Sequence, residues 1–311
     1  MKWLKKGRIF EPSGQTSWMK KYGILPTPYF IEEKNIIRIF FGTSDEDNVC
    51  KITYLDVNAD NPSEIIYLRK EPVLSEGEKG LFDEHGLNPS QIIYFNNQPY
   101  LFYIGYQRMV GVPYLLFASY GILNETLDKC VFRKKVPMLD RTELEPFIRS
   151  ALTIVQEKDE YYVWYVSAYK WEVINTNLFK NKLLPNYNIK FAKTKNFKDF
   201  DIFEKPVIQA QNSDEFGFGR PWCVKENGVF KMWYSLRRKN ITYRIGYAES
   251  KDGIHWTRKD DEVGIDVSES GWDSEMICYP AVIKVKNKTY MFYNGNNNGL
   301  TGFGYAELVE E

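Results

Sequence analysis

Residues 100–106 read YLFYIGY, a short apolar and aromatic strand that returns in five versions along the 311-residue chain. The other versions are IRIFFGT at 37–43, YVWYVSAY at 162–169, KMWYSLR at 231–237 and YMFYNGN at 290–296. Two further patterns return with a similar step of about 60 residues. One is the start of an apolar strand, and the other is a strand ending in Pro or Gly plus an aliphatic residue, such as KEPVL at 70–74. Such periodicity predicts a fold built from copies of one unit.

Each unit is long enough for four strands, and the strand pattern that ends the unit has an early copy at the N-terminus, KKGRI at 5–9. The last unit stops after its third strand, GFGYAEL at 302–308. We therefore expect the N-terminal strand at 4–10 to complete the last unit, which leaves no exposed edge. The sequence predicts an all-β fold: a single five-bladed β-propeller domain spanning residues 1–311, with four antiparallel strands per blade. The alternative is a two-sheet sandwich whose repeats arise by chance.

Composition narrows the class of protein. The chain has 41 Lys+Arg against 41 Asp+Glu, which argues against a general nucleic-acid or membrane-surface binder. Hydrophobic residues make up 43%, enough for a sizeable core, and no run approaches the length of a membrane span. The N-terminus has no apolar segment typical of a secretory signal. The four cysteines are widely spaced, as expected for free thiols in a reducing, cytoplasmic location.

Two groups of loops are expected to meet at one end of the propeller. These are the loops that precede the first strand of each unit, called leading loops below, and those between the second and third strands. Carboxylates gather in the leading loops: Asp83, Glu84, Glu143, Glu145, Asp214, Glu215, Asp273 and Glu275. Residues expected to bind substrate are Arg149, Arg220, Tyr279, His85, Asn88, Arg108, Arg237 and Trp171. Loops on a rigid scaffold are where binding sites usually lie.

Each of these assignments has a structural alternative. Asp83 and Asp273 both follow an aromatic residue at matching positions, so each can instead hold its loop by accepting backbone hydrogen bonds. Arg149 and Arg220 share one repeat position and are expected to point into the channel mouth; the alternative is a salt bridge to Glu145 or Glu215. The long segment 169–188 is either a lid over the site, with Trp171 stacking on a ligand, or a loop packed on the fourth blade.

The chain resembles a known superfamily. Residues 250–256, SKDGIHW, resemble the S-x-D-G-x-x-W turn of five-bladed propeller carbohydrate-active enzymes of the arabinanase/xylosidase, invertase/levansucrase and mannoside-phosphorylase types. The aromatic second strands and the K-x-P-V-L strands fit the same pattern over the whole chain. The chain also resembles the N-terminal propeller domain of plant glucosamine inositolphosphorylceramide transferases and their bacterial stand-alone relatives, which are linked to surface-polysaccharide synthesis.

The resemblance implies a site for sugars but departs from the hydrolases at one residue. Those enzymes place a catalytic Asp at the start of the first inner strand, where this chain reads YGILPTP at 22–28. Glycoside hydrolysis usually needs two carboxylates. Glu275 or Asp83 as base or nucleophile and Glu145 as general acid are the expected substitutes. Glu275 is expected beside Arg220 and Tyr279.

Three functions stay open at this point. The first is a glycosidase-like enzyme acting on a sugar or nucleotide-sugar, which the arginines lead us to expect to be anionic. The second is a non-catalytic propeller that binds a glycan or nucleotide-sugar, and the third is a transferase or lyase of bacterial polysaccharide biosynthesis. No cofactor or metal is expected, because the two histidines, His85 and His255, lie on different blades; a central cation held by carboxylates is the alternative. No nucleic-acid or membrane partner is expected.

Overall fold

The structure is a computed structural model that describes residues 1–310. Strands dominate it, and within these residues the helical segments are three short ones: η1 (Glu32–Lys34), η2 (Asp260–Glu262) and α1 (Asn296–Gly299). The expected all-β class is therefore confirmed. No helix in residues 1–310 is long and apolar enough to cross a membrane. The four cysteines form no disulfide, and Cys130 alone among them is partly exposed.

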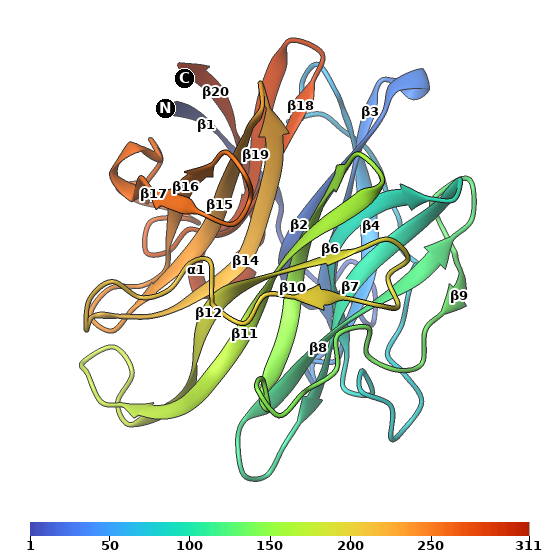
Figure 1. Ribbon diagram of the computed structural model, residues 1–311. Helices are drawn as coiled ribbons and strands as arrows, with labels where there is room; N and C mark the ends of the chain where they lie inside the picture. The colour runs from blue at the N-terminus through green and yellow to red at the C-terminus, as the bar shows by residue number, and fades with distance from the viewer. Residues whose placement is uncertain (311) are drawn as a thin grey trace.

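The strands of residues 1–310 fall into five sets of four that follow one another along the chain (Figure 1). The first set is β2 (Lys21–Ile31), β3 (Ile36–Ser44), β4 (Cys50–Asn58) and β5 (Ile65–Leu68). The second is β6 (Leu87–Phe95), β7 (Gln98–Arg108), β8 (Tyr114–Leu123) and β9 (Cys130–Arg133). The third is β10 (Ile148–Glu157), β11 (Glu160–Ile174), β12 (Lys182–Thr194) and β13 (Asp201–Ile202). The fourth is β14 (Glu215–Glu226), β15 (Val229–Arg238), β16 (Arg244–Ser250) and β17 (Trp256–Arg258).

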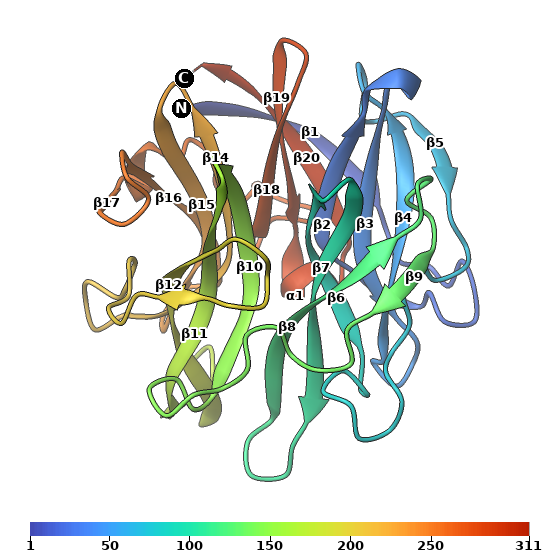
Figure 2. The same ribbon diagram turned by 45° about the vertical axis from the view of Figure 1, so that its right-hand side comes forward.

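The last set joins the two ends of the chain. Its strands are β18 (Cys278–Val285), β19 (Lys288–Asn294), β20 (Phe303–Glu310) and β1 (Lys2–Phe10). β1 runs antiparallel to β20, so the N-terminal strand occupies the outer place that the sequence assigns to it. Both termini lie side by side in Figures 1 and 2.

Pairing within each set is antiparallel, and the first strands of the sets contact one another. β2 contacts β6 and β18, and β14 contacts β10 and β18, while β6 also contacts β10. A single parallel pair, Arg149 with Phe117, joins the second and third sets into one eight-stranded sheet. Figure 2 shows β2, β10, β14 and β18 around the middle of the molecule, and β5, β9 and β17 at its outside.

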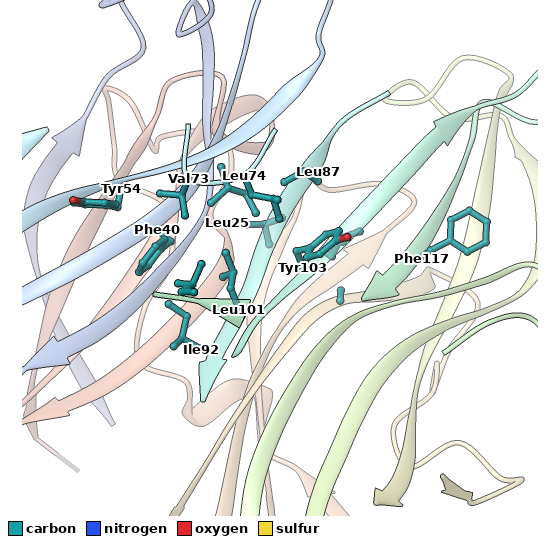
Figure 3. Packing of buried hydrophobic residues seen from close by; sticks show 14 of the residues in the cluster. Leu25, Phe40, Tyr54, Val73, Leu74, Leu87, Ile92, Leu101, Tyr103 and Phe117 are labelled. Atoms are coloured by element: carbon teal, nitrogen blue, oxygen red, sulfur yellow. The ribbon is translucent and has the colours of Figure 1, made fainter. Parts of the chain in front are cut away.

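Apolar side chains from neighbouring sets fill the space between them. Figure 3 shows one such region, where Phe40 and Tyr54 of the first set lie near Leu87 and Leu101 of the second. The second strands are buried on both faces, as β3 is along its whole length, because a sheet covers each side. This explains why the repeat shows most clearly as a continuous apolar and aromatic run.

Each first strand carries a bulge opposite the central aromatic residue of its second strand. Register shifts lie between 24 and 27, 89 and 91, 150 and 152, 219 and 222, and 278 and 281. Four residues at these bulges have left-handed φ angles: Leu25 (58°), Ala151 (42°), Arg220 (40°) and Tyr279 (55°). Non-glycine residues in this region are strained, and bulges redirect side chains, so the inner strands are shaped for more than pairing.

The long segment 169–188 continues the hairpin of β11 and β12 rather than forming a separate loop. Its apolar residues Ile174 and Leu184 pack with Phe216 of β14. The Thr176 hydroxyl donates a hydrogen bond of 2.8 Å to the carbonyl of Lys239 in the fourth set. The structure therefore has the second alternative, packing on the fourth set, and not a free lid.

Candidate ligand-binding cavity

A cavity of about 520 Å³ lies among the first strands and the loops between second and third strands. Its wall is rich in tyrosine and arginine. The polar wall residues are Tyr22, Tyr106, Tyr114, Tyr187, Tyr243, Tyr279, Arg108, Arg220, Arg237, Asn48, Asn88, Ser150 and Asn298. No aspartate or glutamate of residues 1–310 lines it. The cavity thus offers aromatic faces, hydrogen-bonding groups and positive charge, but no carboxylate.

Arg220 lies at the centre of the inner strands. One of its guanidinium nitrogens donates to the carbonyls of Pro26 and Tyr279, at 2.9 Å each. The other donates to the Thr27 hydroxyl at 2.8 Å and toward the Ser90 carbonyl at 3.4 Å. The residue is 1% exposed, and every acceptor named is neutral. Burial lowers the pKa of this guanidinium to about 9, as expected for a buried cation without a carboxylate partner.

Arg237 enters the cavity from β15 between aromatic rings. Its guanidinium lies 4.4 Å from the ring centre of Phe216, 4.9 Å from that of Tyr187 and 5.5 Å from that of Tyr243. One nitrogen donates to the Pro185 carbonyl at 3.0 Å. The residue is 3% exposed, so its charge is held by ring faces and one backbone carbonyl.

Buried polar atoms without a partner in the protein gather at this cavity. They are Nε of Arg220, Nε of Arg237, Oδ1 of Asn88, Oγ of Ser150, Oη of Tyr187 and Oδ1 of Asn298. Buried polar groups in folded proteins are nearly always paired, and each exception calls for an explanation. The strained residues Leu25, Ala151, Arg220 and Tyr279 line the same cavity. Strain and missing partners in one place are typical of a ligand site.

Five of the eight residues expected to bind substrate line the cavity: Asn88, Arg108, Arg220, Arg237 and Tyr279. His85 and Trp171 do not. The His85 ring nitrogen Nδ1 accepts from the backbone of Arg108 at 3.4 Å, and Trp171 packs edge-on against Tyr114 at 5.7 Å. The cavity wall also includes Tyr22, Tyr106, Tyr114, Tyr187 and Tyr243, which sequence reasoning missed. Their only signal is the unusual tyrosine content of the chain.

Arg149 does not point into the cavity. Its Nε lies 3.5 Å from Glu145, and its Nη2 donates to the Tyr165 hydroxyl at 3.3 Å. The physical reason is the bulge in β10, where Ala151 and not Arg149 has the left-handed conformation that Arg220 has in β14. A shift of one residue turns a strand side chain to the other face. The salt-bridge alternative therefore describes Arg149, whereas Arg220 makes no bond to Glu215.

Asp83 and Glu145 belong to a repeated arrangement, called here the tyrosine–carboxylate cluster. In it, the central tyrosine of the second strand donates to a carboxylate that also contacts a cation. Tyr103 donates to Asp83 at 2.9 Å, and Arg133 binds the same carboxylate. Tyr165 donates to Glu145 at 2.9 Å, with Lys190 at 3.8 Å. Both carboxylates are buried, and neither lines the cavity.

The last two sets contain the same cluster, and the first set does not. Tyr293 donates to Asp273 at 2.9 Å, and Lys5 of β1 binds that carboxylate at 2.7 Å. In the fourth set, Tyr234 donates to Asp260 at 2.6 Å, and Arg258 bridges Asp260 and Glu215. In the first set, Phe41 stands where the others have tyrosine, and the side chain of Glu11 in the leading loop pairs with Arg8. Hydroxyl and carboxylate are absent together, as an architectural pair would be.

Glu275 lies in the leading loop of the last set with an exposed side chain. Its backbone, not its carboxylate, makes the bonds: its amide donates to Asn296 at 2.8 Å, and its carbonyl accepts from Arg244 at 3.1 Å. The cavity wall, with Arg220 and Tyr279, does not include Glu275. Within residues 1–310, no group of three or more His, Cys, Asp or Glu side chains is placed to hold a metal ion.

Solved structures with the same fold are glycoside hydrolases. A "Glycoside hydrolase" matches with a TM-score of 0.72 and 16% identity, covering 98% of this chain and 90% of that one. A thermostable family-43 glycoside hydrolase matches at 0.65 and 16%, covering 94% and 90%. A complex of BT0996 with RGII in its description matches at 0.72 and 16%, covering 99% and 92%. The chain therefore has the propeller-type, all-β fold of these enzymes.

At the level of sequence, no family model matches the chain. A curated relative does: the uncharacterized protein Rv1502 of Mycobacterium tuberculosis (strain ATCC 25618 / H37Rv) is 32% identical over 308 residues, covering 99% of both chains. At this identity over the full length, the chain belongs to the family of Rv1502.

Proposed function

We propose that this protein binds an anionic sugar or sugar derivative in the cavity around Arg220 and Arg237. The observation that carries the proposal is the cavity wall, which has two buried guanidinium groups with unpartnered Nε atoms and no carboxylate. A buried charge without a counter-charge is costly, and an anionic ligand would remove that cost. Guanidinium groups bind carboxylate and phosphate in a bidentate manner.

The rest of the wall suits a sugar. Tyrosine rings offer flat apolar faces with polar tips, the two kinds of contact that a sugar ring and its hydroxyls need. Oδ1 of Asn88, Oγ of Ser150 and Oη of Tyr187 lack partners and are available to ligand hydroxyls. A cavity of about 520 Å³ falls in the size range of small-molecule sites. The RGII complex of a structural neighbour supports a carbohydrate ligand by fold analogy alone.

We further propose that each four-stranded set is one blade of a five-bladed propeller forming a single domain. The contacts of β2 with β6, β6 with β10, β10 with β14, β14 with β18 and β18 with β2 support a closed order of inner strands. The relation to glucosamine inositolphosphorylceramide transferases, a role in polysaccharide synthesis and a cytoplasmic location stay predictions of the sequence.

A glycosidase-like enzyme is the second candidate, favoured by the likeness in fold to glycoside hydrolases. It requires an acid and a base or nucleophile at the scissile bond, for which Glu275, Asp83 and Glu145 are the sequence-based candidates. Asp83 and Glu145 are committed to Tyr103 and Tyr165, and Glu275 makes its bonds through its backbone. We therefore favour binding over hydrolysis.

Calorimetric titration with matched sugars tests the proposed function. Glucose, galactose and mannose are each offered as the neutral sugar, the uronate and the 6-phosphate. We expect an anionic form of at least one sugar to bind more than tenfold tighter than its neutral form, because charge-assisted hydrogen bonds contribute about 1.5–3 kcal/mol. Neutral sugars that bind as tightly as their anionic forms would contradict the proposal.

A cavity-filling variant locates the site. A Cβ on Gly219 would lie 3.5 Å from Ser235 Cβ and 3.6 Å from a Tyr279 ring carbon, ordinary packing distances, so a small side chain fits there. Gly219→Leu extends into the cavity and should abolish binding, whereas Gly219→Ala should retain it, both with melting temperatures near that of the unmodified protein. Full binding by a folded Gly219→Leu variant would place the ligand elsewhere.

A further inference from the structure

The four buried arginines of residues 1–310 divide into two pairs. Arg38 forms a two-bond ion pair with Asp56, at 2.8 Å for each bond, and Arg149 lies beside Glu145. Arg220 and Arg237 are as deeply buried as these, yet the acceptors they contact are backbone carbonyls and one hydroxyl. The two arginines without a carboxylate are the two that line the cavity. Two positive charges therefore meet one enclosed volume without any negative charge from the protein.

Other charged groups do not change this balance. The tyrosines that face Arg237, among them Tyr187 and Tyr279, stay neutral because burial raises the pKa of their hydroxyls well above 10. The thiols of Cys50 and Cys278 beside the site are neutral because burial raises their pKa as well. Arg108 at the wall adds positive charge; its guanidinium donates to the Asp47 carbonyl.

We propose that the natural ligand carries two negative charges on one group, as a sugar phosphomonoester does, rather than the single charge of a uronate. This inference rests on the proposed function, since it concerns the same cavity. A phosphomonoester carries a charge of about −1.5 to −2 at pH 7, with three acceptor oxygens. Those oxygens match the free Nε–H donors of Arg220 and Arg237, and they neutralise both buried guanidinium groups at once. A carboxylate neutralises only one of them.

A comparison of phosphate with sulfate isolates the charge. A sugar 6-sulfate has nearly the shape of the 6-phosphate but carries one negative charge. Calorimetric titration at pH 7.5 should give a Kd for the 6-phosphate about ten- to a hundredfold lower than for the 6-sulfate and the uronate, the effect of one charge-assisted hydrogen bond. Equal affinity for phosphate and sulfate would overturn the dianion inference while leaving the binding of anionic sugars intact. Equal affinity for the neutral sugar would overturn both.

Removing one of the two charges provides the second test. Arg237→Gln leaves a single unpaired guanidinium, so the preference for phosphate over sulfate should fall to within about twofold, and Arg237→Lys should restore part of it. Arg38→Gln is the matched control, because Arg38 is equally buried but has Asp56 as its own counter-charge. That variant should melt at a lower temperature with an unchanged phosphate-to-sulfate ratio. A folded Arg237→Gln variant that keeps the full preference would overturn the inference.

Discussion

Asp83 and Glu275 show how two carboxylates of similar sequence context acquire different roles. Both lie in leading loops, and the sequence makes both candidates for catalysis. The structure buries Asp83 completely and gives it two partners, Tyr103 and Arg133, whereas the Glu275 side chain faces solvent. The preceding aromatic residue, Phe82, stacks on Tyr103 at 6.1 Å and fixes the direction of the Asp83 side chain. Asp83 therefore stabilises the fold.

Stability measurements separate these two carboxylates. Asp83→Asn keeps the shape but removes the counter-charge of Arg133, and breaking such a buried ion pair costs about 3–5 kcal/mol. Glu275→Gln should change the free energy of unfolding by less than about 0.5 kcal/mol, as surface substitutions usually do. Urea titration followed by tryptophan fluorescence checks both values. An Asp83→Asn variant as stable as the unmodified protein would contradict the structural role of the cluster.

At the scale of the element, the bulge of each first strand decides which side chains reach the cavity. Alignment of the repeats by sequence puts Arg149 and Arg220 at one position because each precedes the Ser150 or Pro221 position. The backbone instead matches Ala151 with Arg220, since these two residues share the left-handed φ. The strand periodicity of two makes such a small offset decisive. The strands could thus be predicted from sequence, but not the directions of the side chains that line the cavity.

A glycine substitution tests whether the bulge is strained. Ala151 has φ 42°, where an alanine is strained and a glycine is not. Ala151→Gly should leave the free energy of unfolding unchanged or raise it by up to about 1 kcal/mol. Ala192→Gly is the control, because Ala192 is buried in the regular pairing of β12, where glycine should cost about 1 kcal/mol. Equal losses in the two variants would show that the bulge carries no strain at Ala151.

At the scale of the whole molecule, the repeat made the architecture predictable. Four strands per unit, the order of the units and the displaced N-terminal strand all followed from five copies of one pattern, because each unit packs its apolar faces against its neighbours. The function did not follow in the same way. The cavity combines residues of all five sets, such as Leu25, Asn88, Ser150, Arg220 and Tyr279, and no pattern within one repeat reveals that combination.

The N-terminal strand provides the final prediction. β1 covers the outer edge of β20, buries Trp3, Ile9 and Phe10, and supplies Lys5 to the Asp273 carboxylate. Deleting residues 1–12 exposes that strand edge and removes the cation of one tyrosine–carboxylate cluster. The melting temperature measured by circular dichroism should therefore fall sharply or the fold should be lost. An unchanged melt would contradict the role of β1 in joining the two ends of the chain.

Two point variants within β1 distinguish loss of packing from loss of chain length. Trp3 is 6% exposed and stacks edge-on with Trp233 at 6.2 Å, whereas its neighbour Leu4 is 50% exposed on the other face of the same strand. Trp3→Ala should cost about 3–5 kcal/mol, as large-to-small changes in a core do, and Leu4→Ala less than about 0.5 kcal/mol. Because both variants keep the whole strand, a large loss in Trp3→Ala alone would show that β1 stabilises the molecule through the side chains it buries against the fourth set.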